Sequence, residues 1–583
     1  MAKRRSAPAP QPPAPDLPLR LLPLVLAAGL ILRLLYIRAI HDDALTKVLV
    51  VDASFYDAWA KKILQGDWLG REVFYQDPLY AYFIAFCYKL FGPDPGAVRI
   101  VQAFLDTGTL ALLYGIGALS LSSWAGLAAA GMAAFYGPLV YYTGLLDKTT
   151  FTVFLIALSL ASFSLACRRG LRWSALAGIT VGLAALARGN MLIAAAGMAA
   201  WLCRSGQGQD RLRRGLLFAL AAAGVIGTVT VRNAWVGKDL VLVSANAGLN
   251  FLIGNNPRSA GIYIEPPFLH GVPATEYPES KEYAERSTGR SPMKASEVSA
   301  FYLGQGLQFI RDQPGAWLRL AARKIFLAAN RLEIAETYSY DYFAERYAVL
   351  RWAFLDFRLL FALGLLGAGV FWARAGPHEL HVFSLAYGLS LVVFFMASRY
   401  RLPLAIPLAL FGAWYLVEVL PGCLARKSRA WTHAGAAGVL LLLSGWIPDW
   451  VEQRVVKPTR ATPHAIAGFI YCQKLGEADA GLRELERARS IHPGVAGVDI
   501  HMAQCYITKG DTERAVSHYA AAVQEDPSAH EAYNNLGVIY FTRRDYRPAL
   551  AAFTAALRLR PDNALYQRNV AQAQAGLARG QGR

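Results

Sequence analysis

The sequence predicts an all-α protein: a polytopic membrane helical bundle of about eleven spans, followed by a C-terminal α-solenoid of helical repeats. Two observations lead to this fold class. Of the 583 residues, 55% are hydrophobic and only 17% are charged, a composition too apolar for an ordinary soluble protein. After about residue 460 the long apolar runs stop, and a helical pattern with a period of about 34 residues takes their place.

The formal net charge of +18 reflects membrane topology. Lys and Arg concentrate in short loops between apolar runs, as they do in cytoplasmic loops under the positive-inside rule. We therefore expect no nucleic-acid partner. The six cysteines are scattered, without a CxxC pair or metal-ligand spacing, so they indicate neither a metal site nor a disulfide framework. Most of them are expected to be packing residues.

Residues 1–19 are basic and then rich in proline, and they are expected to be disordered because they cannot bury enough apolar surface to fold. The apolar run 20–40 is longer than the hydrophobic region of a signal peptide and has no small-residue cleavage site after it. It is therefore predicted to be a retained first membrane helix. Lys3, Arg4 and Arg5 would then hold the N-terminus in the cytoplasm.

Eleven apolar segments are long enough, or nearly so, to span a bilayer. They are 20–40, 98–119, 122–143, 149–167, 173–187, 190–203, 213–232, 354–373, 382–398, 402–421 and 431–447. Alternation from a cytoplasmic start places the basic loops inside and three polar stretches outside: 41–97, 233–353 and the chain after 447. An alternative joins 173–187 and 190–203 into one bent helix plus a re-entrant piece, but the basic loop at 204–214 argues against it.

The membrane domain is predicted to cover 20–447, with a linker at 448–461 and a repeat domain at 462–583. Residues 530–563 match the tetratricopeptide pattern at Leu536, Gly537, Tyr540, Ala549, Phe553, Ala556 and Pro561. One period earlier the pattern recurs from Met502 to Pro527, and a degenerate copy ends at Pro493. The solenoid could serve stability and assembly, or it could be a docking surface on the outer side; both uses stay open.

The first outer loop begins with Asp52 at the exit of the first membrane helix. Tyr56, Trp59 and Ile63 then recur on one helical face, which predicts a helix lying in the membrane interface that ends at Gly66. Asp52 could simply cap this helix. Ser54 could cap it instead, with Asp57 completing a capping box, which would leave Asp52 free for chemistry.

A succession of motifs gives Asp52 its context. After it come FYQDPLYAYFIAFCYKLFG at 74–92, GLLDKTTF at 144–151, GLAALARGN at 182–190 and SRYRLP at 398–403. Over roughly 20–447 this order resembles the GT-C glycosyltransferase superfamily, specifically bacterial members similar to protein O-mannosyltransferases and aminoarabinose transferases. The resemblance implies transfer of a sugar from a polyprenyl-phosphate donor to an acceptor on the extracytoplasmic face. It makes Asp52 the catalytic acid of the first loop and Asp147 the second acidic position.

The leaving group in such a reaction is a lipid phosphate, which calls for fixed positive charge at the membrane surface. The candidates lie at predicted helix ends: Arg99, Arg188, Arg399 and Arg401. Two arginines on the outer face, at 399 and 401, run against the positive-inside statistics and favour phosphate binding. The alternative for either residue singly is snorkelling to lipid headgroups.

Substrate contacts are expected from aromatic and amide side chains near these motifs. They are Tyr56, Asp77, Tyr400, Asn250, Asn255 and Asn256. Asp77 could equally be a turn residue ahead of Pro78. The aminoarabinose transferases tend to have Lys before this proline; here Gln76 and Asp77 precede it, which speaks against that particular substrate.

The resemblance also implies partners and a location. They are a polyprenyl-phosphate sugar donor, membrane lipid, and a protein or cell-envelope acceptor docked by the repeats. No cofactor is certain, and a divalent metal ion at Asp147 stays open. The expected location is the bacterial inner membrane, with the repeat domain in the periplasm. Two other classes compete: an O-antigen-ligase-like or polymerase-like membrane enzyme, and a transporter or membrane anchor for the repeat domain.

Overall fold

The computed structural model describes residues 17–205, 210–269, 273–374, 378–425, 427–495 and 497–581. Within these ranges the chain is helical and forms no strand, apart from two isolated bridges that join Tyr136 to Leu355 and Ile262 to Met396. The predicted all-α class is therefore confirmed. Most of the N-terminal stretch 1–19 lies outside the described residues, and the first helix already begins at Leu17.

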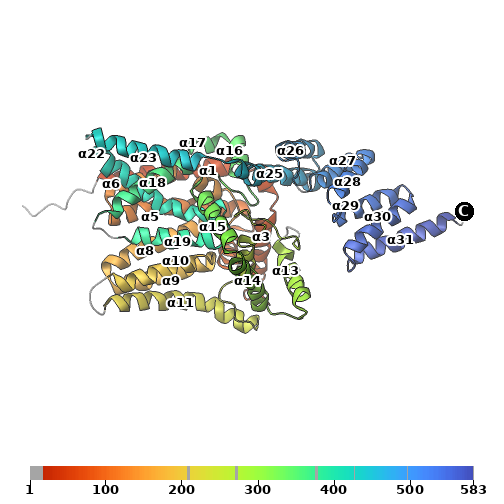
Figure 1. Ribbon diagram of the computed structural model, residues 1–583, viewed down its shortest axis with the longest axis horizontal. Helices are drawn as coiled ribbons and strands as arrows, with labels where there is room; N and C mark the ends of the chain where they lie inside the picture. Colours follow the sequence, from red (N-terminus) through yellow and green to blue (C-terminus); the bar gives the residue numbers. More distant parts are fainter. Residues whose placement is uncertain are drawn as a thin grey trace, which may run out of the picture. The chain divides into compact units, whose positions relative to one another are not determined.

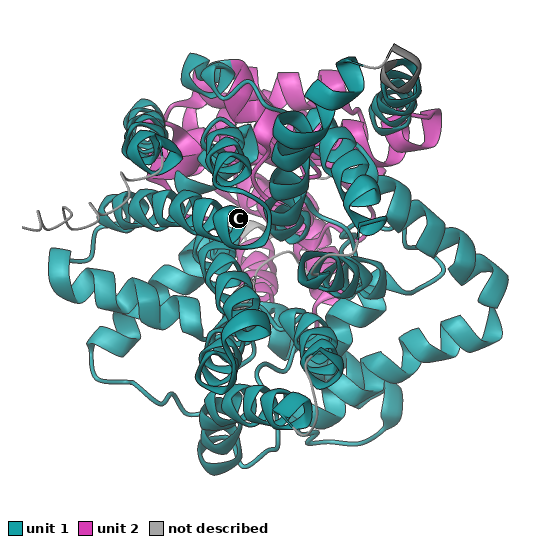
Figure 2. Ribbon diagram, turned by 90° about the vertical axis from the view of Figure 1, so that its left-hand side faces the viewer, with its two compact units in different colours: residues 1–41, 51–333, 346–446 teal, residues 42–50, 334–345, 447–583 magenta. Residues whose placement is uncertain are grey.

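The chain divides into two compact units (Figure 2). Unit 1 comprises 1–41, 51–333 and 346–446, and unit 2 comprises 42–50, 334–345 and 447–583. Two short pieces of the expected outer loops therefore belong to the unit that carries the repeats. The sequence had assigned both pieces to the membrane domain.

Unit 1 is a bundle of long apolar helices that run side by side (Figure 1). Within the described residues, six helical stretches are long and apolar enough to cross a membrane: Leu17–Ala39, Pro95–Ser120, Thr149–Arg169, Asp210–Val236, Ser398–Leu424 and Trp431–Leu475. Shorter apolar helices are α4 (Leu79–Phe91), α9 (Leu171–Ala187), α10 (Met191–Arg204), α18 (Phe357–Trp372) and α19 (Glu379–Val393). The chain is an integral membrane protein, and the number of eleven spans stays a prediction.

The predicted apolar segments coincide with helices, with one interruption. Segment 122–143 is divided into α6 (Ser123–Ala134) and α7 (Gly137–Thr143). The break follows from Pro138, which fits the first turn of a helix but cannot donate the hydrogen bond that a continuous helix would need there. The other membrane helices are α1 (Leu17–Ala39), α5 (Pro95–Ser120), α8 (Thr149–Arg169), α11 (Asp210–Val236), α20 (Ser398–Arg401), α21 (Ala405–Trp414), α22 (Leu420–Leu424) and α23 (Lys427–Gly445).

Small residues let the helices approach closely. A Cβ atom on Gly178 of α9 would lie 2.2 Å from the carbonyl oxygen of Phe218 on α11. Likewise, a Cβ atom on Gly367 of α18 would lie 2.1 Å from the carbonyl oxygen of Phe411 on α21. Because lipid gives little hydrophobic driving force for helix association, such close backbone packing is a main source of bundle stability.

Two ion pairs are enclosed in the bundle. Arg33 of α1 donates to Asp106 of α5 over 2.6 Å, and both side chains are buried. Arg33 also donates to the carbonyl oxygens of Gly29 and Ala134, so most of its donors are used by the protein. Glu379 of α19 pairs with Arg168 of α8 at 2.8 Å. A buried charge is tolerated when it is paired in this way, and the first pair fixes α1, which leads directly to the outer loop of Asp52.

The polar outer segments fold into short helices. In the first loop α3 spans Val51–Leu64, and it buries Tyr56, Ala60 and Ile63 within the protein. That this helix lies in the membrane interface stays a prediction. The second loop contains α12 (Ala247–Gly254), α13 (Pro273–Thr288), α14 (Ala295–Asp312), α15 (Pro314–Ala329), α16 (Tyr340–Arg346) and α17 (Ala348–Trp352). All of them except α16, most of which belongs to unit 2, lie in unit 1.

Unit 2 consists of stacked helix pairs. It contains α24 (Asp449–Val451), α25 (Lys457–Ile470), α26 (Ala478–Ile491), α27 (Val498–Thr508), α28 (Thr512–Glu525), α29 (His530–Thr542), α30 (Tyr546–Leu559) and α31 (Ala564–Gln581). The expected linker 448–461 is instead almost entirely helical. Its apolar residues Val451, Val455 and Val456 are buried, because the helix packs them against the rest of the unit. The short helix α2 (Ala44–Lys47), from the first outer loop, packs against α25.

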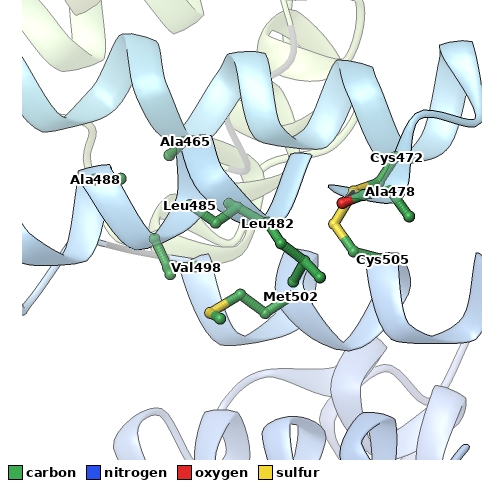
Figure 3. Packing of buried hydrophobic residues seen from close by; sticks show 9 residues of the cluster. All are labelled: Ala465, Cys472, Ala478, Leu482, Leu485, Ala488, Val498, Met502 and Cys505. Atoms are coloured by element: carbon green, nitrogen blue, oxygen red, sulfur yellow. Dashed lines mark hydrogen bonds between the residues drawn. A yellow bond between two sulfur atoms is a disulfide. The ribbon is translucent and has the colours of Figure 1, made fainter. Parts of the chain in front are cut away.

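A disulfide joins Cys472 and Cys505 beside the core cluster that contains Leu482, Leu485 and Met502 (Figure 3). This disulfide was not predicted, because the spacing of its cysteines matches no common pattern. The two cysteines are 33 residues apart, close to one repeat period, so the stacking of successive repeats brings them together.

Removing this disulfide is expected to destabilise unit 2 by about 3 to 4 kcal/mol, the loop-closure entropy of a loop of this length. Thermal unfolding of the purified protein, with and without reductant, measures the effect. The double variant Cys472→Ser/Cys505→Ser is the control, since reductant should not shift its melting further. An equal melting temperature for oxidised and reduced wild type would contradict the prediction.

Candidate functional site

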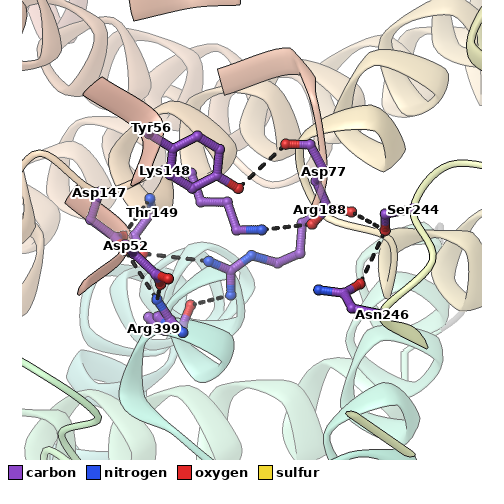
Figure 4. Close-up of polar contacts among 10 residues, drawn as sticks. All are labelled: Asp52, Tyr56, Asp77, Asp147, Lys148, Thr149, Arg188, Ser244, Asn246 and Arg399. Atoms are coloured by element: carbon purple, nitrogen blue, oxygen red, sulfur yellow. Dashed lines mark hydrogen bonds and ion pairs between the residues drawn. The ribbon is translucent and has the colours of Figure 1, made fainter. Parts of the chain in front are cut away.

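The site is organised by one guanidinium group that two carboxylates share (Figure 4). Nη1 of Arg399 lies 2.9 Å from Oδ2 of Asp52 and 3.2 Å from Oδ2 of Asp147. Asp52 comes from α3, Asp147 from the turn before α8, and Arg399 from α20. The three side chains are largely but not fully buried, with exposed fractions of 22%, 9% and 17%. Three of the predicted site residues therefore meet.

Asp52 does not cap α3. The helix begins at Val51, so Asp52 lies inside its first turn, and its carboxylate faces Arg399. Ser54 is not the cap either, because its hydroxyl donates back to the carbonyl oxygen of Val51. Val51 itself has a φ of +50°, a left-handed conformation that a β-branched residue rarely adopts. Such local strain is typical of functional sites, where surrounding contacts hold a residue in place.

Asp147 is held as a carboxylate. Its Oδ1 accepts a hydrogen bond of 2.7 Å from the backbone N–H of Thr149. Burial works to raise the pKa of Asp147, but the charges of Arg399 and Arg188 and the bond from Thr149 outweigh it and hold the pKa below its usual value. Asp147 is therefore ionised at neutral pH, and it can orient Arg399 throughout a reaction.

Arg188 is a second, deeply buried guanidinium at the C-terminal end of α9. It is 2% exposed, and its Nη1 donates to the backbone carbonyl oxygen of Arg399 at 3.0 Å. The ring of Tyr400 stacks against it, with the guanidinium carbon 4.7 Å from the ring centroid. Its Nε atom has no hydrogen-bond partner in the part of the chain that the structure describes. A buried donor of this kind suits an anionic ligand.

Next to this cluster, Asp77 is the centre of a second polar group. Its Oδ2 accepts from Nζ of Lys148 at 2.6 Å, and its Oδ1 accepts from the hydroxyl of Ser244 at 3.0 Å. Asn246 lies 3.2 Å from the same hydroxyl. The hydroxyl of Tyr56 donates to the backbone carbonyl of Asp77, and burial raises the pKa of Tyr56, which keeps it a neutral donor.

Sequence reasoning had missed Lys148 and Ser244 as members of this group. Lys148 follows Asp147 in the motif at 144–151, but no role was predicted for it. Ser244 lies 167 residues from Asp77 in the chain. The fold brings them together, and a short motif carries no signal for such a contact.

For the other two predicted arginines, Arg99 and Arg401, phosphate binding stays a prediction. Arg401 is 1% exposed and is bound by the carbonyl oxygens of Asn330 and Leu332 and by Glu333, 3.0 Å away. These contacts give it a structural role in anchoring the segment that follows α15. Arg99 is buried in the second turn of α5, where its charge acts on the hydroxyl groups of Tyr80 and Tyr88.

The predicted amide contacts are largely engaged by the protein. Nδ2 of Asn255 donates to the carbonyl oxygen of Val393, and its Oδ1 accepts from Trp317 and Lys324. The side chain of Asn256 bonds to the last turn of α12. Asn250 is half-buried on α12. These groups fix α12 against α15 and α19, and a role in substrate binding stays a prediction.

A divalent metal ion at Asp147 stays a prediction. Such ions in proteins are held by several oxygen ligands. Among the described residues there is no group of three or more His, Cys, Asp or Glu that could hold one. Asp52 and Asp147 instead direct one oxygen each at Arg399, which supplies the positive charge between them.

Comparison with known proteins identifies the class. Residues 76–235 match the family model described as dolichyl-phosphate-mannose-protein mannosyltransferase, and residues 502–564 match that of the tetratricopeptide repeat. The resemblance predicted from the sequence is thereby confirmed, and it indicates a membrane glycosyltransferase with C-terminal repeats. A comparison with curated protein sequences finds no significant match.

Two solved structures are similar at low identity. One is the oligosaccharyltransferase AglB of Archaeoglobus fulgidus in complex with an inhibitory peptide and a dolichol-phosphate, with 15% identity over 73% of this chain and a TM-score of 0.40. The chain spans only about half, 54%, of that protein. The other is ArnT of Cupriavidus metallidurans bound to undecaprenyl phosphate, with 14% identity over 70% of this chain and 80% of that chain and a TM-score of 0.31.

Glu276 of α13 is a further acid whose charge acts on the site. Burial raises its pKa to about 7, and the negative charges of Asp52, Glu265 and Glu279 add to the effect. Since the usual value is 4.5, the folded protein holds an extra proton between these two pH values. The stabilisation from protonated Glu276 is full below the lower value and is lost as the pH rises through about 7.

We expect Glu276→Gln to raise the melting temperature at pH 8 by a few degrees and to leave it nearly unchanged at pH 5, because glutamine mimics the neutral acid. Differential scanning calorimetry of the detergent-solubilised protein measures the melting temperature at both pH values. Glu282→Gln is the matched control, since it removes the same charge from an exposed position of the same helix. Identical pH dependence in the two variants would contradict the assignment.

Proposed function

We propose that the protein is a glycosyltransferase that moves a sugar from a polyprenyl-phosphate-linked donor to an acceptor on the extracytoplasmic face of a membrane. The observation that carries the proposal is the shared contact of Asp52 and Asp147 with Arg399, with Arg188 beside it. Carboxylates next to guanidinium groups, at the ends of apolar helices, combine the two things such a reaction needs: a base for the acceptor and a cationic site for a lipid phosphate.

The donor phosphate is assigned to Arg188 and Arg399. A guanidinium group offers planar, paired N–H donors that match phosphate oxygens. The buried Nε of Arg188 supports this assignment, because a phosphate oxygen would satisfy it. The polyprenyl chain would lie along the apolar helices of unit 1, so that only its phosphate reaches the polar cluster.

Asp52 is assigned as the base. The hydroxyl of the acceptor attacks the anomeric carbon, its proton passes to the carboxylate of Asp52, and the bond from the anomeric carbon to the phosphate oxygen breaks. The phosphate keeps the electron pair, and the guanidinium groups stabilise its growing negative charge. Asp147 fixes Arg399 by their ion pair, which keeps the positive charge at one place during the reaction.

Substituting Asp52→Asn should lower sugar transfer by about 10²-fold to 10⁴-fold while the protein stays folded, because the proton acceptor is lost. Membranes that contain each variant are assayed with a panel of polyprenyl-phosphate sugars. Asp57→Asn is the matched control: it lies on the same helix, carries the same charge, and pairs with Lys61 and Tyr88 instead. Equal transfer by wild type and Asp52→Asn would reject the assignment.

We also propose that unit 2 lies on the extracytoplasmic side, in the periplasm of a bacterium, where the repeats bind a protein or cell-envelope acceptor. The disulfide between Cys472 and Cys505 supports this side, because such bonds persist in oxidising compartments. Tetratricopeptide repeats expose surfaces that suit protein binding.

A topology reporter fused to the C-terminus is expected to read extracytoplasmic. The same reporter fused within the basic loop at 204–214 is expected to read cytoplasmic, because this loop carries clustered arginines. A cytoplasmic signal from the C-terminal fusion would contradict the proposed orientation.

A further inference from the structure

Lys148 is a third cation of the site, and the chemistry proposed above does not use it. Its Nζ lies 2.6 Å from Oδ2 of Asp77, and the two side chains are 12% and 11% exposed. The same ammonium group lies 6.0 Å from the centroid of the Tyr56 ring. An ammonium group has three N–H donors. The hydrogen bond to Asp77 uses one of them, so donors remain for a ligand.

The position of Lys148 in the chain links it to both guanidinium groups. Three consecutive residues each contact a different member of the site (Figure 4): Asp147 contacts Arg399, Lys148 contacts Asp77, and Thr149 contacts Arg188 through its hydroxyl at 3.4 Å. The turn before α8 thus gathers the cations of the site around one short segment. A phosphate bound at Arg188 and Arg399 would lie within the reach of a flexible lysine on that segment.

Asp77 can release Lys148 without losing its own position. The hydroxyl of Ser244 still donates to Oδ1, and the hydroxyl of Tyr56 still donates to the backbone carbonyl. A serine hydroxyl has one proton, so Ser244 cannot donate to Asp77 and to Oδ1 of Asn246 at once. If the Asn246 amide is flipped, so that its nitrogen and oxygen exchange places, its NH2 group donates to Ser244, and Ser244 donates to Asp77. The carboxylate is anchored, and the lysine is the movable partner.

The charge of the phosphate grows during the proposed reaction. A sugar-phosphate diester carries one negative charge, whereas the phosphate monoester that departs carries about −1.5 to −2 at neutral pH. Arg399 already faces two carboxylates. Together with Arg188, Lys148 can supply positive charge where the new charge appears.

We infer that Lys148 is a ligand of the leaving group: it pairs with Asp77 in the resting site and passes to the phosphate of the departing polyprenyl phosphate as the sugar is transferred. This inference rests on the proposed function. Lys148 transfers no proton in this step and only exchanges one hydrogen-bond acceptor for another. The proton of the acceptor hydroxyl goes to Asp52, and the electron pair of the broken bond goes to the phosphate oxygen.

Equilibrium binding to the purified full-length protein tests the inference without any turnover. The probes are undecaprenyl phosphate, its neutral analogue undecaprenol, and inorganic phosphate. Lys148→Ala is expected to weaken the binding of undecaprenyl phosphate by about tenfold to a hundredfold, the usual loss for a hydrogen bond to a charged group. Its affinity for undecaprenol should not change, which also shows that the variant is folded.

The control is Lys61→Ala, which removes a lysine from another Lys–Asp pair, the exposed one with Asp57 on α3. It should leave all three affinities unchanged. Asp77→Asn removes the carboxylate that competes for Lys148 and keeps a side chain that can form a hydrogen bond with Ser244. It is therefore expected to tighten the binding of undecaprenyl phosphate several-fold. Opposite shifts from the two members of one ion pair distinguish ligand exchange from a merely structural pair.

Three results would overturn the inference: equal affinities for Lys148→Ala and Lys61→Ala, weakening by both Lys148→Ala and Asp77→Asn, or equal binding of inorganic phosphate and undecaprenyl phosphate. The proposed function is tested separately by transfer assays. If wild type transfers sugar but Lys148→Ala binds undecaprenyl phosphate as tightly as wild type, only the leaving-group role of Lys148 is rejected. If Lys148→Ala weakens the binding of undecaprenyl phosphate but wild type transfers sugar from no donor, only the proposed transferase function is rejected.

Discussion

The ion pairs between Arg399 and the two carboxylates are the interaction on which the site depends. They join residues 347 and 252 positions apart in the chain, so they hold the first loop, the turn before α8 and the short helix α20 in one place. Each charge would be costly to bury alone, and the sharing makes the three tolerable together. Thr149 and Arg188 then fix the partners from outside: one binds the carboxylate of Asp147, and the other binds the carbonyl of Arg399.

This arrangement explains why sequence reasoning reached part of the site. Asp52, Asp147 and Arg399 each stand at the end of an apolar segment, and hydropathy locates such ends well. The order of motifs then suggested that they act together. Arg399 and Arg401 looked equivalent in the sequence, yet they are two positions apart on a helical turn and face different partners. One meets Asp52, and the other meets Glu333.

Other features depend on contacts that no local pattern encodes. Lys148 finds Asp77 across 71 residues of chain, and the amide of Asn255 is used by Trp317 and Lys324 from α15. The cysteine pair of unit 2 follows the same rule, since its spacing acquires meaning only when the repeats stack. The helices within 448–461 were not predicted for another reason: the valines buried there are too few to stand out among polar neighbours in the sequence, although they are enough to pack one helix.

Residues 42–50 are part of unit 2, and the peptide bond after Val50 leads to Val51 and Asp52 of unit 1. The boundary between the two units therefore passes through the backbone next to the proposed base. A chain shortened after residue 447 would lose the helices against which 42–50 and 334–345 pack. Such a truncation would therefore expose surfaces of both segments in addition to removing the repeats.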